Sequence, residues 1–315
     1  MADKQIGRRR FVLGLGSSLY VLLGKTYCSA GQTSKSMNIQ IDADALSVST
    51  GGSGDPALLL HGFGSSKFTW RHICRALGNT FTYYAIDLPG SGLSPAPIDF
   101  DYSLENIADV VTDFIVRKDL RRLSVFGASL GGGIALLSLL RHERELAKRI
   151  RSLCIIDGIA YPQDFPFFVD LLRIPFFGPM IVDLVSPEAQ ARAVLRNCYF
   201  DEGLITQEQV NQYAGPFKRK EVRHALIKTA RSINTERLSL YLPQLATISV
   251  PSLLIWGRED RVVPLDIGQR LAKALSRAQL VIIDRCGHMP QEECPDAVIA
   301  AIRLFVDKTL KDRPH

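Results

Sequence analysis

The sequence predicts an α/β fold: a mostly parallel sheet of eight strands with helices on both faces and a block of helices inserted into it. Two observations predict this class. From about Met37 onward, short apolar runs alternate with amphipathic stretches of roughly 10 to 15 residues, the pattern of strands joined by helical crossovers. The alternation breaks once, between Asp157 and Pro251, where the pattern is helical.

Each of the eight expected strands is a short apolar run. Near-continuous apolar runs such as ALLL at 57–60 are typical of strands that are buried on both faces. In chain order the runs are NIQID at 38–42, ALSVST at 45–50, PALLLHG at 56–62, TYYAID at 82–87, RLSVFGA at 122–128, SLCIID at 152–157, PSLLIWG at 251–257 and AQLVIID at 278–284.

The break in the pattern predicts a helical cap. A loop of this length without secondary structure would be improbable in a compact domain. Ser186 followed by Pro187 is typical of a helix start, and Thr206 and Gln209 have the spacing of a capping box. We therefore expect a cap at 159–246, inserted into a core made of residues 37–158 and 247–311.

Most of the excess positive charge lies in the first 30 residues. The formal net charge is +6; residues 1–30 hold five basic residues and one acidic residue, a net +4 that leaves +2 for the rest. This gives no electrostatic reason to expect a nucleic-acid partner. Arg8 and Arg9, the apolar run at 11–24 and the small residues up to Ala30 are typical of a twin-arginine export signal at 1–30.

The leader therefore predicts export machinery as a partner and a location in the periplasm or outside the cell. Its apolar run is shorter than the roughly 20 residues that span a bilayer. An uncleaved leader that associates with the membrane, and a cytoplasmic protein whose leader is not used, stay open as alternatives.

One glycine-rich corner carries the strongest chemical signal. Gly127, Ser129 and Gly131 form G-x-S-x-G between a predicted strand and a predicted helix. Such a turn holds the serine hydroxyl above the sheet, while the helix N-terminus favours developing negative charge. A serine alone is a poor nucleophile, so a base and an orienting acid must follow.

Candidates for both partners lie after the last two predicted strands. His288 is in the loop after the final strand, and Asp260 follows the strand before it, in the chain order Ser, Asp, His. The carboxyl ends of parallel strands open onto one crevice, so the three side chains can meet. Asp157, which ends the preceding strand, stays an alternative acid. This chemistry needs no metal and no cofactor.

Together these motifs resemble the α/β-hydrolase superfamily, from about Met37 to Lys311. The resemblance implies Ser129 as nucleophile, His288 as general base and Asp260 as the acid, with the backbone N–H groups of Phe63 and Leu130 as the oxyanion hole. The matching motifs are HGFG at 61–64, DLPGSGLS at 87–94, GASLGG at 127–132, GRED at 257–260 and GHMP at 287–290.

A serine at this corner suits attack on acyl carbon, whereas relatives that open epoxides or displace halide carry aspartate there. We therefore expect hydrolysis of a carboxylic ester or lactone of a small to medium apolar acyl group through an acyl-enzyme. The aromatic run at 161–180 suggests an apolar wall over the crevice, although its rings can equally pack the cap onto the core. The candidate substrate-binding residues are Phe63, Phe165, Phe168 and Met289.

Three alternative functions stay open. A carbon–carbon bond hydrolase of the meta-cleavage-product type has a similar GREDRVVPLD segment, although such enzymes usually carry tryptophan where Met289 stands. Cofactor-free haloperoxidases or perhydrolases share the triad. Outside enzymes, the chain could be a ligand-binding protein on a hydrolase scaffold. Nothing in the sequence predicts the oligomeric state.

Overall fold

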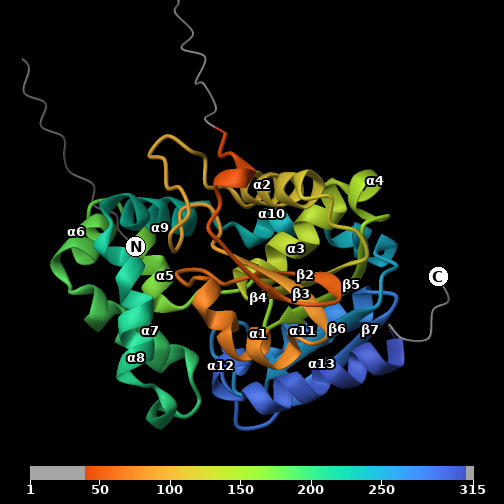
Figure 1. The fold of residues 1–315 in the computed structure, drawn as a ribbon. Helices are drawn as coiled ribbons and strands as arrows, with labels where there is room; N and C mark the ends of the chain where they lie inside the picture. The colour runs from red at the N-terminus through yellow and green to blue at the C-terminus, as the bar shows by residue number, and fades with distance from the viewer. Residues whose placement is uncertain (1–39, 310–315) are drawn as a thin grey trace, which may run out of the picture. The chain divides into compact units, whose positions relative to one another are not determined.

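The computed structural model describes residues 40–309 (Figure 1). The expected leader at 1–30 lies outside the described residues. One sheet of seven strands has the order β1-β3-β2-β4-β5-β6-β7; β1 pairs antiparallel with β3, and the other neighbours pair parallel. The strands are β1 (Val48–Gly52), β2 (Asp55–Leu60), β3 (Phe81–Ile86), β4 (Leu123–Ala128), β5 (Ile150–Ile156), β6 (Ser252–Gly257) and β7 (Ala278–Ile283).

Within residues 40–309 the sheet has seven strands, one fewer than the eight that the sequence predicts. Of the run NIQID, the described residues 40–42 form no strand and lead into a 3-10 turn, η1 (Ala43–Ala45). The carboxylate of Asp42 accepts the N–H of Asp44 and caps this turn. An Asx-type cap competes locally with strand pairing, and here it directs the chain into a turn before β1.

Side chains on alternate residues of each strand pack against different helices. In β2, Leu58 and Leu60 belong to one core cluster, whereas Ala57 and Leu59 belong to another. The first cluster also contains residues of α2 (Leu104–Arg117), α3 (Leu130–Arg141) and α11 (Leu265–Ala274), and the second contains residues of α1 (Arg71–Leu77) and α13 (Pro295–Thr309). In Figure 1, α2 and α3 lie above the sheet and α1 and α13 below it. This covering of both faces explains the apolar runs in the sequence.

All regular elements between β5 and β6 are helical, and none of the described residues there forms a strand. We call residues 158–250 the helical insertion. Its helices are α5 (Phe167–Arg173), α6 (Phe177–Leu184), α7 (Pro187–Cys198), η3 (Glu202–Leu204), α8 (Gln207–Ala214), η4 (Gly215–Lys218), α9 (Lys220–Ser232), α10 (Thr235–Ser239) and η5 (Leu242–Thr247).

Both predicted helix starts in the insertion are confirmed. Ser186 caps α7 with Pro187 as the first helical residue, and Thr206 and Gln209 form a reciprocal capping box at α8. The boundaries of a cap domain at 159–246 stay a prediction. The remaining helices are η2 (Lys67–Trp70), α4 (Glu143–Leu146) and α12 (Pro290–Glu293).

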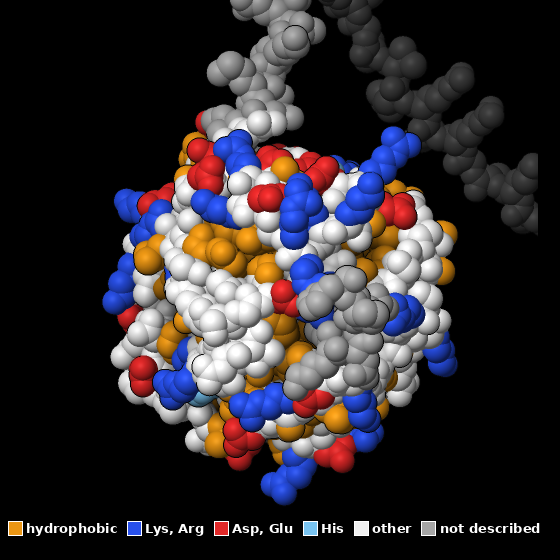
Figure 2. Space-filling model, turned by 45° about the vertical axis from the view of Figure 1, so that its right-hand side comes forward, with side chains coloured by type: hydrophobic (Ala, Val, Ile, Leu, Met, Phe, Trp, Pro, Cys, Tyr) orange, Lys and Arg blue, Asp and Glu red, His pale blue; other side chains and the backbone are white. Residues whose placement is uncertain are grey.

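Charged side chains of both signs are interspersed on the face shown in Figure 2. Many of them pair, as Arg141 does with Asp109 and Arg149 with Glu145. Within residues 40–309, no helix is both long enough and apolar enough to span a bilayer.

Candidate active site

Ser129 occupies the sharp corner between β4 and α3. Its backbone has φ 51° and ψ −118°, a conformation that non-glycine residues rarely adopt and that costs on the order of 1–3 kcal/mol. Two hydrogen bonds hold the corner: its N–H donates to the carbonyl of Ile156 (2.9 Å), and its carbonyl accepts the N–H of Ile159 (3.2 Å). The end of strand β5 and the loop that follows it therefore hold this strained conformation.

The two glycines of the motif are required by close packing. A Cβ atom on Gly127 would lie 2.5 Å from the carbonyl oxygen of Gly131, and one on Gly131 would lie 2.2 Å from that of Leu60. Both contacts are with backbone atoms, which cannot move aside cheaply. The spacing G-x-S-x-G therefore lets α3 start directly against β2 and β4.

His288 lies in the loop between β7 and α12 and contacts both of its expected partners. Its Nε2 is 2.9 Å from Oγ of Ser129, and its Nδ1 is 2.8 Å from Oδ2 of Asp260. The main-chain N–H of His288 donates to the carbonyl of Cys198 at the end of α7 (2.6 Å). The helical insertion thus helps to position the imidazole ring.

Asp260 is buried and held by its own turn. Its Oδ1 accepts the N–H groups of Val262 (2.7 Å) and Val263 (3.0 Å), which leaves Oδ2 for the imidazole. The structure thus brings together Ser129, His288 and Asp260, the three residues that the sequence singled out.

Asp157, the alternative acid, is fully buried beside Asp260. Its Oδ1 accepts the N–H of Gly257 (3.0 Å). Burial, and then the negative charge of Asp260, raise the pKa of Asp157 well above its usual range. The hydrogen bond to His288 is made by Asp260, and the raised pKa of Asp157 favours the protonated form of this second acid.

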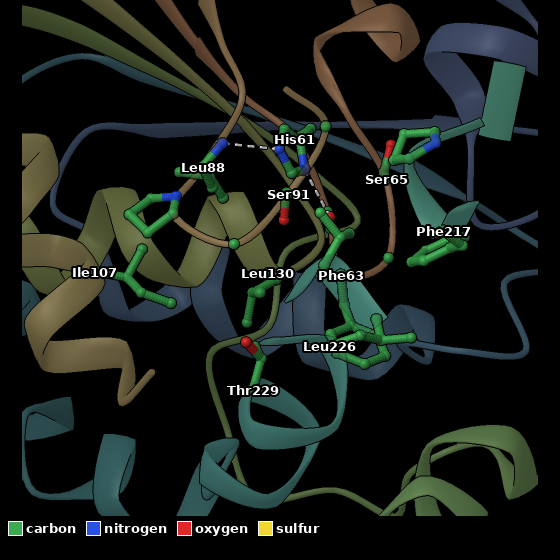
Figure 3. Close-up of a pocket in the computed structure, with 17 residues that line it drawn as sticks. His61, Phe63, Ser65, Leu88, Ser91, Ile107, Leu130, Phe217, Leu226 and Thr229 are labelled. Atoms are coloured by element: carbon green, nitrogen blue, oxygen red, sulfur yellow. Dashed lines mark hydrogen bonds between the residues drawn. The ribbon is translucent and has the colours of Figure 1, made fainter. Parts of the chain in front are cut away.

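The loop that carries the expected oxyanion donor is fixed by His61. The Nδ1–H of this buried imidazole donates to the carbonyl of Gly62 (2.8 Å), and its Nε2 accepts the N–H of Leu88 (3.0 Å), as the dashed lines in Figure 3 show. Burial lowers the pKa of His61, which keeps the ring neutral for this double role. His61 thus has a structural role in holding this loop.

The two residues expected to supply the oxyanion donors lie close to Ser129. Phe63 follows Gly62, and a Cβ atom added to Gly62 would lie 3.0 Å from Cβ of Ser129. Leu130 is the first residue of α3, so its N–H is one of those that a helix leaves without an intrahelical partner. Phe63 and Leu130 both line the small cavity drawn in Figure 3.

A cavity of about 350 Å³ opens above Ser129 and His288. Predominantly apolar side chains line it, and no Lys, Arg, Asp or Glu is among its described lining residues. Three of the four predicted substrate-binding residues, Phe63, Phe168 and Met289, line this cavity. Phe165 instead lines an adjoining cavity of about 60 Å³, which also reaches Ser129.

The sequence reasoning missed two buried carboxylates directly after the histidine loop. Glu292 accepts hydrogen bonds from Oγ1 of Thr69 (2.7 Å), Nη1 of Arg71 (2.7 Å), Nε2 of Gln209 (3.2 Å) and the hydroxyl of Tyr213. It therefore ties the core to helix α8 of the insertion. The signal in the sequence was a pair of adjacent acids, in MPQEE, directly after the histidine loop.

Glu293 acts on the histidine loop itself. Its carboxylate accepts the N–H of Gly287 (2.7 Å), next to His288, and the N–H of Asp201 in the insertion (2.8 Å). The loop is thus fixed from both sides.

Three side chains at this site carry oxygen or nitrogen atoms of the kind that bind metal ions. Asp157, Asp260 and His288 present such atoms within 4.8 Å of one another. Both ring nitrogens of His288 are already engaged, one with Ser129 and one with Asp260. This arrangement favours a hydrogen-bonded relay over a metal centre.

The seven-stranded sheet and a serine corner with histidine and acid partners define an α/β hydrolase. The chain belongs to this family, because the sequence model of the family described as alpha/beta hydrolase fold matches residues 55–295. It is 31% identical to an uncharacterized hydrolase, YugF, of Bacillus subtilis over 247 residues, which cover 78% of this chain and 88% of that protein.

Two further similarities concern carbon–carbon bond hydrolases. The chain is 27% identical to the 2-hydroxymuconate semialdehyde hydrolase of a Pseudomonas species over 248 residues, 77% of this chain and 83% of that protein. The solved structure of CumD, a meta-cleavage product hydrolase from Pseudomonas fluorescens, matches with a TM-score of 0.73 at 23% identity, covering 87% of this chain and 98% of CumD. The latter likeness shows the fold alone.

Proposed function

We propose that this chain hydrolyses carboxylic esters or lactones with a neutral, apolar acyl group. One observation carries the proposal: Ser129 and His288 line an apolar cavity that has no charged side chain among its described lining residues, and Asp260 bonds to His288 behind them. The geometry supplies a nucleophile, a base and an orienting acid.

The proposed reaction begins when Oγ of Ser129 attacks the acyl carbon and its proton passes to Nε2 of His288. Asp260 holds the ring through Nδ1–H and balances the charge of the imidazolium. The N–H groups of Phe63 and Leu130 stabilise the oxyanion, each contributing about 10²- to 10³-fold in rate. His288 then protonates the leaving alcohol, and water activated by the same ring releases the acid and restores Ser129.

The cavity determines the substrate class in this proposal. Its volume of about 350 Å³ lies near the lower end of the range for ligand sites, about 300–1,000 Å³. Phe168, Leu171 and Val194 contribute to an apolar wall that stabilises a hydrocarbon chain but has no partner for a charge. Small to medium apolar acyl groups therefore suit the site.

The second candidate is hydrolysis of a carbon–carbon bond. The similarity to the 2-hydroxymuconate semialdehyde hydrolase favours it. The substrate in that name is a muconate derivative and carries a carboxylate, and the cavity offers it no described Lys or Arg side chain. This absence of a counter-charge is why we favour an ester.

Export stays part of the proposal. The twin-arginine-like pattern at 1–30 supports delivery to the periplasm or beyond, with export machinery as a transient partner. Fractionation of cells that express the full chain, compared with an Arg8→Lys/Arg9→Lys variant, tests this. Retention of the variant in the cytoplasm is expected, and an equal distribution of the two proteins would contradict the proposal.

A substrate panel tests the enzymatic proposal. We expect turnover of p-nitrophenyl acetate, butyrate and octanoate, slower or no turnover of 2-hydroxymuconate semialdehyde, and labelling by a fluorophosphonate. Ser129→Ala should remove turnover and labelling while circular dichroism stays unchanged. Ser65→Ala is the matched control: Ser65 lines the same cavity, but its hydroxyl donates to the carbonyl of Ser66 (3.4 Å) rather than to a base, so its variant should still be labelled. Preference for the ring-fission product would favour the second candidate; no reaction at all would favour a binding protein.

A further inference from the structure

Helices α5 and α6 expose an unusual number of large apolar side chains. We call Phe167, Phe176, Phe177, Met180, Leu184 and Val185 the outer apolar patch. Phe176 is 89% exposed, Phe167 78% and Leu184 76%. Single exposed apolar residues are normal, but several on neighbouring turns mark an interaction site. Helix α6 lies at the left edge of the molecule in Figure 1, far from α13.

The patch borders the substrate cavity at two of its residues. Phe167 and Val185 are exposed and also line the cavity, so they lie at its rim. Ile181, one turn before Val185 in α6, lines it as well. The opening of the cavity is therefore continuous with the apolar surface outside it.

The backbone holds one ring of the patch outward. Phe176 has φ 67°, a left-handed conformation that a bulky residue rarely adopts. It is the residue before α6, and its carbonyl accepts the N–H of Met180 (3.2 Å). The ring of Phe176 is therefore exposed on a backbone that is itself strained.

Basic residues lie beside the patch. Residues 217–224 contain four Lys or Arg and one Glu, a net +3, which the paired acids Asp183 and Glu188 outside the segment reduce to +1. Arg223 pairs with Asp183 of α6 (3.0 Å), which places this segment against the patch. Lys218 reaches Glu188 at the start of α7 (3.5 Å) and stays largely exposed. Aromatic rings bordered by cations suit the interface of a bilayer that contains anionic lipid.

We propose that the outer apolar patch docks onto an anionic lipid surface and that apolar substrates enter the cavity from that surface. The apolar rings would insert at the level of the headgroups, while the basic segment at 217–224 contacts the phosphates. Docking goes beyond hydrolysis and stands without it; only the route of substrate entry rests on the proposed function.

An indole placed in the patch tests docking directly. The chain has two tryptophans, Trp70 and Trp256, and both are fully buried. Phe176→Trp in the full chain therefore adds an exposed reporter, and Leu304→Trp on α13, where Leu304 is exposed, is the matched control. The probe is a vesicle of brominated phosphatidylcholine with about 30% phosphatidylglycerol.

On adding vesicles, we expect the indole fluorescence of Phe176→Trp to be quenched and its emission to shift to the blue, and neither change for Leu304→Trp. Both effects should be lost at high salt or without the anionic lipid. Quenching reports only on lipid next to the indole, so the result holds whether or not residues 1–39 also bind the vesicle. Equal quenching of both reporters, or none at position 176, would overturn the proposal. A blue shift without vesicles that grows with protein concentration would instead show that a second copy covers the patch, which also overturns it.

Substrate entry is tested with Phe176→Ser/Leu184→Ser, since neither residue lines the cavity. The ratio of hydrolysis rates for an emulsified and a monomeric ester should fall by about tenfold, with the monomeric rate unchanged. An unchanged ratio would refute entry from lipid. Failure of the wild-type protein to hydrolyse either ester would instead refute the proposed function, while the quenching result still decides docking.

Discussion

The buried carboxyl groups of Asp157 and Asp260 lie within 4.8 Å of each other at the ends of neighbouring strands. Two carboxylates this close cannot both carry a full charge in a buried site. Burial, the charge of Asp260 and that of Glu293 all raise the pKa of Asp157, so it keeps its proton while Asp260 contacts His288. The difference between the two acids leads to two predictions.

The first prediction concerns activity. Asp157→Asn replaces a neutral acid by a neutral amide and should change kcat/KM for p-nitrophenyl butyrate by less than about tenfold. Asp260→Asn should lower kcat by about 10⁴-fold, because the imidazole loses its orienting charge. Steady-state kinetics of both purified variants measures this. A larger loss for Asp157→Asn would reverse the assignment of the acid.

The second prediction concerns the pH dependence of stability. The unfolded chain releases the proton of Asp157 near pH 3.9, whereas the folded chain keeps it, so this group destabilises the fold increasingly as the pH rises above that value. Asp157→Asn replaces this ionisable carboxyl group by an amide that does not titrate. The free energy of unfolding of the variant relative to wild type should therefore increase between about pH 4 and about pH 7. Urea unfolding at both pH values measures it; a difference independent of pH would argue against a raised pKa.

The third prediction concerns the serine corner. Gly131→Ala would place a Cβ atom 2.2 Å from the carbonyl oxygen of Leu60, so unfolding should become easier by about 1–3 kcal/mol or more. The matched control is Gly215→Ala, where nothing lies within 4 Å of the added atom and the change should stay within about 0.5 kcal/mol. Chemical denaturation compares them, and equal stabilities would disprove the close-packing argument.

The fourth prediction concerns the junction at Glu292. Burial and then the charge of Glu292 raise the pKa of Tyr213 well above its usual range, so the phenol stays a donor to this carboxylate. Tyr213→Phe should lower the free energy of unfolding by about 1.5–3 kcal/mol. Tyr241→Phe, which removes a more exposed hydrogen bond to Arg141, should cost less than about 0.5 kcal/mol.

A double-mutant cycle isolates the contact. Combining Tyr213→Phe with Glu292→Gln should give a coupling energy of about 0.5–3 kcal/mol, because the two side chains bond directly. Strict additivity of the two variants would show that this bond does not stabilise the fold.

The fifth prediction concerns acyl length. Val194 lines both the main and the adjoining cavity. Val194→Phe should fill part of this space and lower the ratio of kcat/KM for p-nitrophenyl octanoate to that for the acetate by about tenfold. The acetate serves as the internal control, since a short acyl group does not need the occupied volume. If both esters lost activity equally, the cavity would not be the acyl site.

Local sequence patterns predicted the parts of the site that are built from neighbouring residues. The strand, the glycine turn around Ser129 and the start of α3 all lie within one short stretch, and the same holds for the capping box at Thr206. Asp42 shows the opposite case: an apolar alternation in NIQID predicted a strand, but the carboxylate caps a turn. A competing local hydrogen bond decided that element.

The sequence by itself determined the α/β class, the helical insertion and the set of residues from which the site is built, because periodicity, glycine spacing and chain order act over short distances. Only the tertiary structure decided that Asp260 rather than Asp157 faces His288, that Glu292 joins the core to α8, and that the cavity opens between exposed aromatic rings. Burial and hydrogen bonding between segments far apart in the chain set these features, since a carboxyl group acquires its charge state and its partners from neighbours that folding brings to it.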